Sequence, residues 1–544
     1  MITLKGKSVF PDICIGKLVF LKRSDGPVKR YWVSDQEAEL ARFEWARNKA
    51  SGQLLELHEK AASSGSAAGA AVFEVHRMML EDVEYCEAVR NMVRTQNVNL
   101  EYAVSVTGDH FCQMFRSMED AYMKERAADV ADITARLLRI LSGREETPLK
   151  LTEPSVVAAD ELVPSETLQL PPQLVLGFVM RRGSLSSHTA ILSRSMGIPA
   201  VVDLGPALKD EYDGELAVID GYTGNVHIRP EEDVLIRLRM KKEQEERGRA
   251  ELLKLRGREN ITKDGRRVKV FANAGSLGDV EKALSSDAGG IGLLRSEMLY
   301  LEGTAAPDEE KQFAFYRSVL EKMKGREVVI RTMDIGADKR VPYLGLAKEE
   351  NPALGMRAIR ICLERPQLLR TQLRALYRAG IYGRLSIMYP MITSVWEVEK
   401  IRQMEKEVKQ QLSNQGISFA QDVPSGIMIE TPAAALVSDE LAKLVDFFSV
   451  GTNDLTQYTL AVDRSNAGLD RFLDMRHRAV LKLIRMAAVN ARKEGIWIGI
   501  CGELAADTSM TEEFLRMGID ELSVAPGMVL PLRKRIRELD LGEH

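Results

Sequence analysis

The chain has 544 residues, which at about 150 residues per domain is enough for three to four domains. Its 75 Lys and Arg residues nearly balance its 79 Asp and Glu residues, and the net charge is −4. A protein that coats nucleic acid or an anionic membrane needs a net basic surface, so the composition excludes both as the main partner. A hydrophobic fraction of 45% and a charged fraction of 28% are typical of a folded globular protein.

The cysteines and the N-terminus indicate where the protein works. No CxxC pair occurs, so the sequence predicts neither a disulfide framework nor a zinc ribbon, and a reducing, cytoplasmic setting is the simplest fit. The start, MITLKGKSVFPDIC, lacks the basic and apolar segments of a signal peptide. No segment approaches the roughly 18 to 20 apolar residues of a membrane span. We expect a cytoplasmic enzyme; its five cysteines are Cys14, Cys86, Cys112, Cys362 and Cys501.

The first half of the chain alternates between strand-like and helix-like segments. Residues 1–20 read as short strands around a turn, and WVSDQEAELARFEWARNKA begins a long series of apolar residues spaced three and four apart. Short apolar runs with Gly, Pro and Asp then return, as in SVVAADEL and GELAVIDGYTGNVHI. We therefore expect residues 21–144 to form a helical subdomain inserted into an α/β domain made of residues 1–20 and 145–230.

A charged segment, EEDVLIRLRMKKEQEERGRAELLKLRG, occupies residues 231–257. Charge on most of its faces favours a helix that links two domains over a core helix. An ordinary surface helix is the alternative interpretation.

Residues 258–544 contain eight strand-like apolar runs, most of them separated by amphipathic helical segments. Runs that are apolar on both faces and alternate with helices indicate a parallel sheet. Eight such units in roughly 280 residues fit a (β/α)8 TIM barrel, and an open doubly wound sheet is the alternative. The runs are RVKVFANA, GGIGLLRSE, EVVIRTMD, RLSIMYPM, SGIMIETP, VDFFSVGTND, GIWIGICGE and DELSVAP.

Polar residues follow several of these runs. The carboxyl ends of barrel strands converge on one mouth, where active sites are built. We therefore expect one site there, although a single charged residue after a strand is often only a solvated loop residue. The strand ends carry Arg295 with Ser296 and Glu297, Arg331 with Asp334 and Lys339, Glu430, Asn453 with Asp454, and Cys501 with Gly502 and Glu503.

These groups have complementary chemistry. Glu430 and Asp454 offer hard oxygen ligands that suit Mg²⁺ or Mn²⁺. Arg295, Arg331 and Arg464 offer planar forks for phosphate and carboxylate groups. Together they predict a small phosphorylated carboxylic acid bound through a divalent cation.

Cys501 and His188 are the candidate reactive groups. A thiol with a pKa near 8.5 is mostly protonated at pH 7, so Cys501 can donate a proton; a small buried apolar residue is the alternative. His188 precedes a short helical pattern among Ser186, Ser187 and Thr189, where a helix N-terminus favours an anion. A neutral imidazole there can accept a phosphoryl group, and a capping histidine is the alternative.

The chain resembles Enzyme I of the bacterial phosphotransferase system, the phosphoenolpyruvate–protein phosphotransferases, over essentially all 544 residues. The segment around His188 is shared with pyruvate phosphate dikinases and phosphoenolpyruvate synthases, whose ATP-grasp domain corresponds to the helical subdomain here. The last three motifs together are specific to Enzyme I. The motifs are SSHTAILSRSMGIPAVV, YMKERAADVADI, GIGLLRSEMLY, IRTMDIGADK, EENPALGMRAIR, IMIETPAA, FFSVGTNDLTQYTLAVDR and CGELAAD.

The resemblance implies a role for each matching residue. His188 would be phosphorylated through Nε2, Glu430 and Asp454 would hold Mg²⁺, and Cys501 would protonate C3 of the enolate. The helical subdomain would dock the carrier protein HPr or a paralogue, the α/β domain would swing between carrier and barrel on the 231–257 helix, and the barrel would form a homodimer. Phosphoenolpyruvate would be bound by Arg295, Arg331, Asn453, Asp454 and Arg464, with Lys339 nearby.

Two segments depart from the family pattern. Gly183-Ser184-Leu185-Ser186 replaces a glycine pair and a threonine before the histidine, and Asp474-Met475-Arg476-His477-Arg478 replaces a proline-containing stretch. Neither removes a catalytic group, and both bear on rates and on the preferred carrier. Asp82, Glu84 and Arg126 are candidate docking residues, with a solvated helix face as the alternative. A nucleotide-dependent dikinase and a catalytically inactive regulatory homologue are the competing functions.

Overall fold

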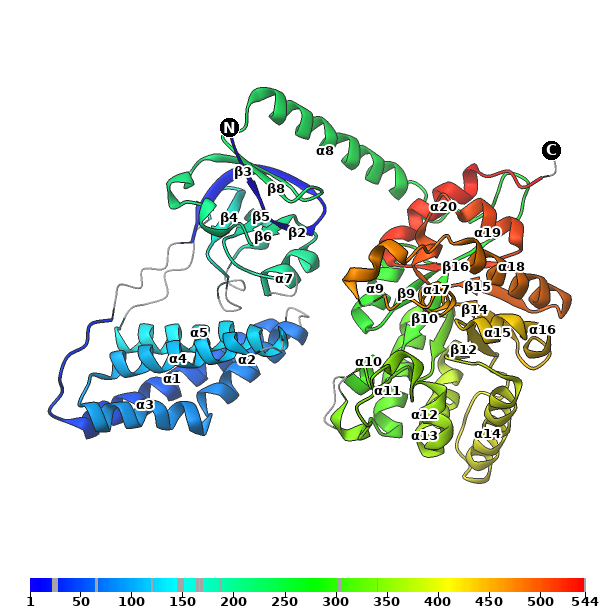
Figure 1. Cartoon of the computed structure of the whole chain (residues 1–544), viewed down its shortest axis with the longest axis horizontal. Helices are drawn as coiled ribbons and strands as arrows, with labels where there is room; N and C mark the ends of the chain where they lie inside the picture. The colour runs from blue at the N-terminus through cyan, green and yellow to red at the C-terminus, as the bar shows by residue number, and fades with distance from the viewer. Residues whose placement is uncertain are drawn as a thin grey trace. The chain divides into compact units, whose positions relative to one another are not determined.

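A computed structural model describes residues 1–21, 28–63, 67–118, 121–143, 151–162, 166, 170–184, 188–301, 305–339, 341–464 and 466–542. The chain divides into two compact units, Met1–Arg247 and Gly248–His544, each of which is described by itself (Figure 1).

The first unit is built on a mixed sheet, whose strands in the described residues run in the order β1-β8-β7-β3-β4-β5-β6-β2. The central neighbours β3, β4, β5 and β6 pair in parallel, and the flanking pairs are antiparallel. Residues 1–20 supply three of the strands, as the sequence predicts. The strands are β1 (Ile2–Lys5), β2 (Lys7–Phe10), β3 (Ile13–Phe20), β4 (Ser155–Ala159), β5 (Val175–Met180), β6 (Ala200–Val202), β7 (Leu216–Asp220) and β8 (Asn225–Ile228), and helix α7 (His188–Met196) lies between β5 and β6 in the chain.

Helices occupy the interval between β3 and β4, as expected. Asp35 caps the first of them, because its Oδ1 accepts a hydrogen bond of 2.9 Å from the Ala38 N–H. Phe43, Val89 and Val104 lie in a core that these helices share and that is separate from the cores of the sheet. The helices are α1 (Gln36–Ser63), α2 (Ala67–Leu80), α3 (Val83–Gln96), α4 (Leu100–Ser117) and α5 (Ala121–Leu141).

Helix α8 (Glu232–Leu253) differs in part from the connector that the charge pattern predicts. Its first two turns bury Val234 and Leu238 against Ile13 and Val218 of the sheet. The remainder is mostly exposed and charged. The two apolar residues four apart therefore make the start of α8 a part of the first unit's core.

The second unit is a closed barrel of parallel strands, so the open-sheet alternative is wrong. Strand β16 pairs with β9 and closes the ring, with Leu522 opposite Val270. Strand β13 is buried at every position, as expected for a strand covered on both sides. The strands are β9 (Lys269–Ala274), β10 (Gly290–Arg295), β11 (Glu327–Arg331), β12 (Arg384–Tyr389), β13 (Ser425–Ile429), β14 (Phe447–Val450), β15 (Trp497–Ile500) and β16 (Glu521–Val524).

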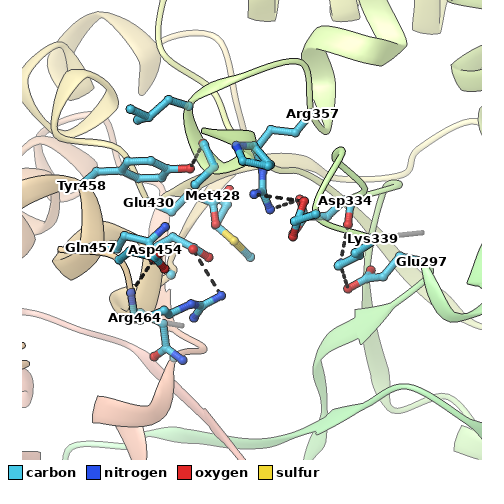
Figure 2. Close-up of a pocket in the computed structure, with 18 of the residues that line it drawn as sticks. Glu297, Asp334, Lys339, Arg357, Met428, Glu430, Asp454, Gln457, Tyr458 and Arg464 are labelled. Carbon is cyan, nitrogen blue, oxygen red and sulfur yellow. Dashed lines mark hydrogen bonds and ion pairs between the residues drawn. The ribbon is translucent and has the colours of Figure 1, made fainter. Parts of the chain in front are cut away.

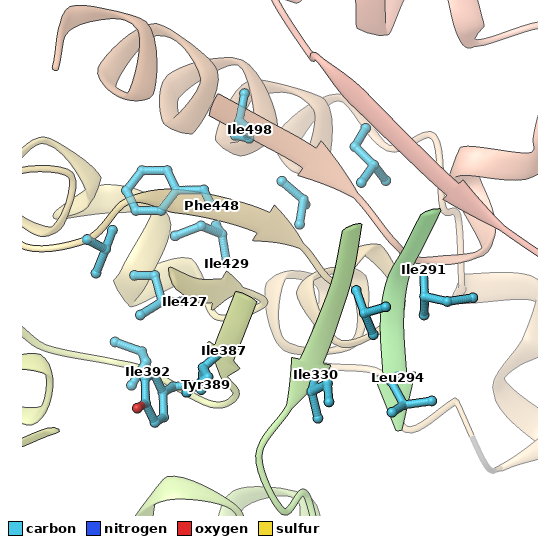
Figure 3. Packing of buried hydrophobic residues seen from close by; sticks show 14 of the residues in the cluster. Ile291, Leu294, Ile330, Ile387, Tyr389, Ile392, Ile427, Ile429, Phe448 and Ile498 are labelled. Atoms are coloured by element: carbon cyan, nitrogen blue, oxygen red, sulfur yellow. The ribbon is translucent and has the colours of Figure 1, made fainter. Parts of the chain in front are cut away.

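Helices cover the outside of the barrel (Figure 1). Figure 3 shows buried residues of this layer, among them Ile330, Ile427 and Phe448. Helix α13 illustrates the packing, because Leu369 and Leu373 are buried on one stripe. The helices are α9 (Leu277–Ser285), α10 (Met298–Leu301), α11 (Glu309–Met323), α12 (Ile359–Glu364), α13 (Pro366–Ala379), α14 (Val395–Asn414), α15 (Pro432–Leu436), α16 (Ser438–Leu441), α17 (Thr452–Leu460), α18 (Arg478–Lys493), α19 (Thr511–Met517) and α20 (Val529–Glu538).

The inner face of the barrel carries a separate small cluster. Leu293, Val329, Met388 and Met428 pack there with Phe447 and Cys501. All five cysteines of the chain are free and buried. In the part of the chain that the structure describes, no helix is both long enough and apolar enough to cross a membrane.

Candidate active site

A cavity of about 890 Å³ opens at the carboxyl ends of the barrel strands (Figure 2). Its wall contains basic, acidic and amide side chains, and its floor contains Leu293 and Met428 from the inner cluster. Every barrel residue to which the sequence assigns a substrate-binding, metal-binding or acid role lines it, whereas Ser296 does not: the lining residues are Arg295, Arg331, Lys339, Glu430, Asn453, Asp454, Arg464 and Cys501.

Arg331 is the most firmly held cation of the cavity. Its Nη2 donates to Glu297 Oε1 at 2.5 Å, and its Nη1 lies 2.9 Å from Asp334 Oδ2. All three side chains are buried, so water competes little with these ion pairs. The guanidinium plane is thereby fixed at the end of β11, with its charge available to the cavity.

Asp334 links Arg331 to two further cations. Arg357 Nη2 donates to Asp334 Oδ1 at 3.3 Å, and Lys339 Nζ donates to the Asp334 carbonyl oxygen at 2.7 Å. Lys339 Nζ also lies 3.7 Å from Glu297 Oε1. Burial alone would raise the pKa of the Asp334 carboxyl, but Arg331, Arg357 and Lys339 outweigh it and lower that pKa to about 2. Asp334 therefore stays ionised and gathers three cations on one side of the cavity.

Two carboxylates occupy another part of the wall. Glu430 follows β13, and its Oε1 accepts a hydrogen bond of 2.5 Å from the Met391 N–H. Burial, reinforced by Asp454 and Asp334, raises the pKa of Glu430 to about 8. Asp454, in the first turn of α17, lies 3.3 Å from Arg464 Nη2. Gly451 leaves room for the Glu430 carboxylate, because a Cβ atom at this position would lie only 3.1 Å from Glu430 Oε2.

Asn453 is held by a reciprocal pair of bonds with Glu503. Its Nδ2 donates to Glu503 Oε1 at 3.0 Å, and its Oδ1 accepts from the Glu503 N–H at 3.0 Å. The pair ties the first turn of α17, after β14, to the segment that follows β15. Arg295 is exposed at the end of β10 and can turn toward a bound anion.

Cys501 lies at the floor of the cavity and is 4% exposed. Its thiol donates to the Val450 carbonyl oxygen at 3.6 Å. Burial raises the pKa of this thiol to about 12, against the opposing effects of Ser449 and Arg331. The group is therefore a protonated thiol at neutral pH, able to donate a proton and poorly suited to act as a thiolate nucleophile.

Glu430 and Asp454 fit a divalent cation. Among the described residues, no group of three or more His, Cys, Asp and Glu side chains could hold a metal by itself. Magnesium sites commonly use one or two carboxylates and complete the shell with substrate oxygens and water. The raised pKa of Glu430 also means that the cations nearby do not compensate its charge, and a cation between the two carboxylates would do so.

His188 is the first residue of α7, in the first unit. The side chain of His188 and residues 185–187 lie outside the described part of the chain, as does the site of the Leu185 and Ser186 departures. Thr189 is buried and Ala190 fully so, which packs the first turn of the helix against the sheet. The structure thus places the histidine at a helix N-terminus and gives no geometry for its ring.

Two other histidines have partners within the first unit and lie outside the barrel cavity. His76 is fully buried in the helical subdomain, and its Nε2 lies 2.9 Å from Asp129 Oδ1. His227 bonds to the Thr3 hydroxyl at 3.0 Å in the sheet, and burial lowers its pKa.

A second cavity, of about 290 Å³, lies in the helical subdomain. Asp82 and Glu84 border it, whereas Arg126 does not and instead pairs with Asp129 at 2.9 Å. Asp82 also caps α3, accepting from the Tyr85 N–H at 2.9 Å. The other residues around this cavity are mainly apolar: Val75, Met78, Met79, Tyr85, Phe111, Met114, Phe115, Val130 and Ile133.

Sequence reasoning about strand ends missed Arg357 and Tyr458 in the barrel cavity. Arg357 lies 26 residues after the end of β11, and Tyr458 lies on the last part of α17, where it donates to the Ala353 carbonyl oxygen. Neither follows a strand directly. The motif EENPALGMRAIR contains Arg357 and is the one signal in the sequence that could have pointed to it.

Comparison with known proteins defines the class. Three family models match the chain: "PEP-utilising enzyme, N-terminal" at residues 5–126, "PEP-utilising enzyme, mobile domain" at residues 151–224, and "PEP-utilising enzyme, PEP-binding domain" at residues 249–541. The chain, with its barrel and the cavity at the barrel mouth, is thus a member of the PEP-utilising enzymes.

The most informative relatives are named phosphoenolpyruvate-protein phosphotransferase. The proteins of Bacillus sp. (strain S) and Geobacillus stearothermophilus are each 41% identical over 538 residues, covering 99% of this chain and 93% of theirs. That of Bacillus subtilis (strain 168) is 40% identical over 541 residues, covering 99% and 95%. A solution structure of an Enzyme I (nEIt) protein is 34% identical over 45% of this chain and 99% of its own, with a TM-score of 0.38. The chain belongs to the phosphoenolpyruvate–protein phosphotransferase family of enzymes.

Proposed function

We propose that this enzyme transfers the phosphoryl group of phosphoenolpyruvate to its own His188 and then to a histidine of the carrier protein HPr or a paralogue. Pyruvate is released, and the reaction is the first step of the sugar phosphotransferase system. One observation carries the proposal: a single barrel cavity collects the cations, the carboxylate pair and the protonated thiol that this chemistry needs. The alternative of an inactive homologue lacks support, since none of these groups is missing.

The substrate is held by charge and by fixed geometry. Arg331, set by Glu297 and Asp334, and Arg464, set by Asp454, present guanidinium groups to the phosphoryl and carboxylate oxygens. Arg295 and Lys339 add positive charge, and Asn453 adds a neutral donor. Phosphoryl transfer depends mainly on positioning and on stabilising the charge of the transition state.

Glu430 and Asp454 would hold Mg²⁺, with Mn²⁺ as a substitute. The bound cation would neutralise phosphoryl oxygens during transfer. Asp454 also pairs with Arg464, whose Nη2 lies 3.3 Å from Asp454 Oδ1.

The transfer breaks the P–O bond of phosphoenolpyruvate and forms a P–N bond at His188 Nε2. The electron pair of the broken bond leaves an enolate, and the Cys501 S–H bond supplies the proton that C3 receives to give pyruvate. Burial keeps the thiol protonated until that step. Protonation of the enolate makes the transfer favourable.

The proposal assigns work to each part of the chain. Residues 1–20 and 145–230 would form the phosphohistidine domain, residues 231–257 the arm on which it moves, and residues 258–544 the phosphoenolpyruvate-binding barrel. Residues 21–144 would dock the carrier at the 290 Å³ cavity, where exposed apolar side chains lie beside Asp82 and Glu84. We further propose a homodimer formed through the barrel and a cytoplasmic location.

Labelled phosphoenolpyruvate and Mg²⁺ test the function. The wild-type protein should acquire an acid-labile phosphoryl group, and His188→Ala should not. His227→Gln is the matched control, a histidine of the same domain, and should label normally. Equal labelling of the His188 variant would refute the assignment, and labelling from ATP instead would support the dikinase alternative.

A further inference from the structure

One side-chain amide joins two neighbouring segments of the barrel where their strand pairing ends. Strands β10 and β11 pair in parallel up to Arg295 and Arg331, the last residue of each strand. Just beyond that pair, Gln372 of α13 binds both segments. Its Oε1 accepts a hydrogen bond of 3.0 Å from the Met333 N–H, and its Nε2 donates to Ser296 Oγ at 2.9 Å. A helix side chain thus continues the connection between the two strands.

The two bridged segments carry the carboxylates that hold Arg331. Glu297 follows Ser296 in the chain, and Asp334 follows Met333. Glu297 and Asp334 line the active-site cavity. Ser296 and Met333 are buried and do not line it, so Gln372 holds the two segments from behind the cavity wall. The separation between the two carboxylates therefore depends on this bridge.

The orientation of the Gln372 amide is determined by its partners. The Met333 N–H can only donate, so the amide atom that faces it is the carbonyl oxygen. The amide nitrogen donates to Tyr316 Oη at 2.9 Å as well as to Ser296. Gln372 is completely buried, so the amide cannot rotate without leaving polar atoms unpaired and away from water.

Helix α11 and the segment before it support this arrangement. Tyr316 Oη accepts from Gln372 and donates to Gln312 Oε1 at 3.2 Å, and Tyr300 Oη donates to the same oxygen at 3.4 Å. Gln312 Nε2 donates in turn to the Pro307 carbonyl oxygen at 2.9 Å. These side chains are buried, and a buried network with paired donors and acceptors favours one arrangement of its members.

The bridge bears on the cations of the cavity because two of them contact both segments. Arg331 Nη2 lies 2.5 Å from Glu297 Oε1, and its Nη1 lies 2.9 Å from Asp334 Oδ2. Lys339 Nζ donates to the Asp334 carbonyl oxygen at 2.7 Å and lies 3.7 Å from Glu297 Oε1 (Figure 2). A shift of one segment against the other would therefore change the orientation of both cations.

We propose that Gln372 is a positioning residue for phosphoenolpyruvate binding and acts by fixing the separation between Glu297 and Asp334. That separation decides whether the Arg331 guanidinium group contacts both carboxylates and a bound anion at once. The proposal rests on the proposed function, in which Arg331 binds the substrate. Gln372 does not line the cavity, so it acts only through the residues that it holds.

Titration calorimetry with Mg²⁺ and phosphoenolpyruvate tests the proposal. Gln372→Met removes the amide at nearly constant volume. We expect its affinity to be about ten- to a hundredfold weaker than that of the wild type, because small displacements of a positioned group are costly. Ser296→Ala removes a single bond of the bridge and should weaken the affinity by a smaller factor. Asn490→Leu is the matched control: it removes a buried amide of α18 that donates to Ser438 Oγ at 2.9 Å, and it should bind normally.

A double-mutant cycle distinguishes positioning of Arg331 from a general structural role. Arg331→Lys removes the planar group that needs both carboxylates in place. If Gln372 acts through Arg331, Gln372→Met should weaken binding by about threefold or less in the Arg331→Lys background. A general structural role would give the same factor in both backgrounds, because independent effects add. The cycle is run with Ser296→Ala if Gln372→Met does not fold.

The outcomes separate this proposal from the proposed function. Unchanged affinity in both Gln372→Met and Ser296→Ala would overturn the role of the bridge and leave the proposed function intact. Equal factors in the two backgrounds of the cycle would also overturn it, as would an equal loss of affinity in Asn490→Leu. Failure of the wild-type protein to bind phosphoenolpyruvate would instead refute the proposed function.

Discussion

Arg331 and Glu297 form a buried ion pair, with Nη2 of the arginine 2.5 Å from Oε1 of the glutamate. Asp334 engages the other terminal nitrogen of the same guanidinium at 2.9 Å. Two carboxylates thus orient the Arg331 guanidinium group before any substrate binds. A lysine ammonium group at this position could not contact both carboxylates and a bound anion with the same geometry.

Arg331→Lys should therefore weaken binding of phosphoenolpyruvate although the charge is kept. The loss of one charge-assisted hydrogen bond is about 1.5–3 kcal/mol, which is roughly ten- to more than a hundredfold in affinity. Titration calorimetry with Mg²⁺ and phosphoenolpyruvate measures it. Arg384→Lys, at the exposed amino end of β12, is the control and should bind normally. Unchanged affinity of the Arg331→Lys variant would show that the planar guanidinium group of Arg331 does not contribute to phosphoenolpyruvate binding.

Cys501→Ala should bind phosphoenolpyruvate but form pyruvate about a hundredfold or more slowly, because a positioned proton donor is lost. Rapid-quench measurement of pyruvate in a single turnover gives the rate. Cys362→Ala is the control, a buried cysteine of α12 outside the cavity, and should be close to wild type. A normal rate in Cys501→Ala would return that residue to a packing role.

Glu430→Gln should abolish the stabilisation that Mg²⁺ gives in the presence of phosphoenolpyruvate. A ligand at a hundred times its Kd stabilises the folded state by about 2.7 kcal/mol, so the melting temperature reports occupancy. Because the pKa of Glu430 is raised to about 8, the amide resembles the form that is stable without metal. The metal-free variant should consequently melt no lower than the metal-free wild type. A full response to Mg²⁺ in the variant would exclude Glu430 as a ligand.

Glu521 should make the barrel less stable as pH rises. Its pKa is about 8 in the folded barrel and near 4.5 in an unfolded chain, so folding takes up a proton between these values. The contribution is complete below about pH 4.5 and is lost as pH rises through 8, with a slope of at most about 1.4 kcal/mol per pH unit. Glu521→Gln should remove this share of the slope, measured by denaturant unfolding from pH 5 to pH 9.

Glu430 keeps its own share of the pH dependence in that variant, since its pKa is also raised to about 8. The quantity to compare is the difference in unfolding free energy between wild type and Glu521→Gln. If that difference stayed constant with pH, Glu521 would be ionised throughout, and burial would not raise its pKa.

Glu84→Lys should slow phosphoryl transfer to a basic carrier protein and leave labelling of the enzyme by phosphoenolpyruvate unchanged. Glu84 is exposed beside the apolar cavity, and reversing its charge reduces the encounter rate with a positive surface by about tenfold or more at low salt. Asp82 is a poorer choice because its replacement also removes the cap of α3. A panel of purified carriers gives the transfer rates, with the exposed Glu56→Lys on α1 as control. Equal rates would place docking elsewhere.

The sequence by itself determined the periodic features of this protein. Eight apolar runs that alternate with amphipathic helices specify the parallel barrel, since a strand covered on both sides must be apolar throughout. Because the carboxyl ends of such strands meet at one mouth, the residues after them, from Arg295 to Cys501, could be grouped in advance.

Only the tertiary structure decided which partners those residues have. Arg357 comes from a long loop, and nothing local in the sequence brings it to Asp334. The charge states of Glu430 and Glu521 follow from burial and from neighbours far away in the chain. The packing of Val234 and Leu238 on the sheet likewise depends on residues more than two hundred positions away, such as Ile13. Periodicity is a property of neighbours along the chain, whereas burial and ion pairing are properties of the folded molecule.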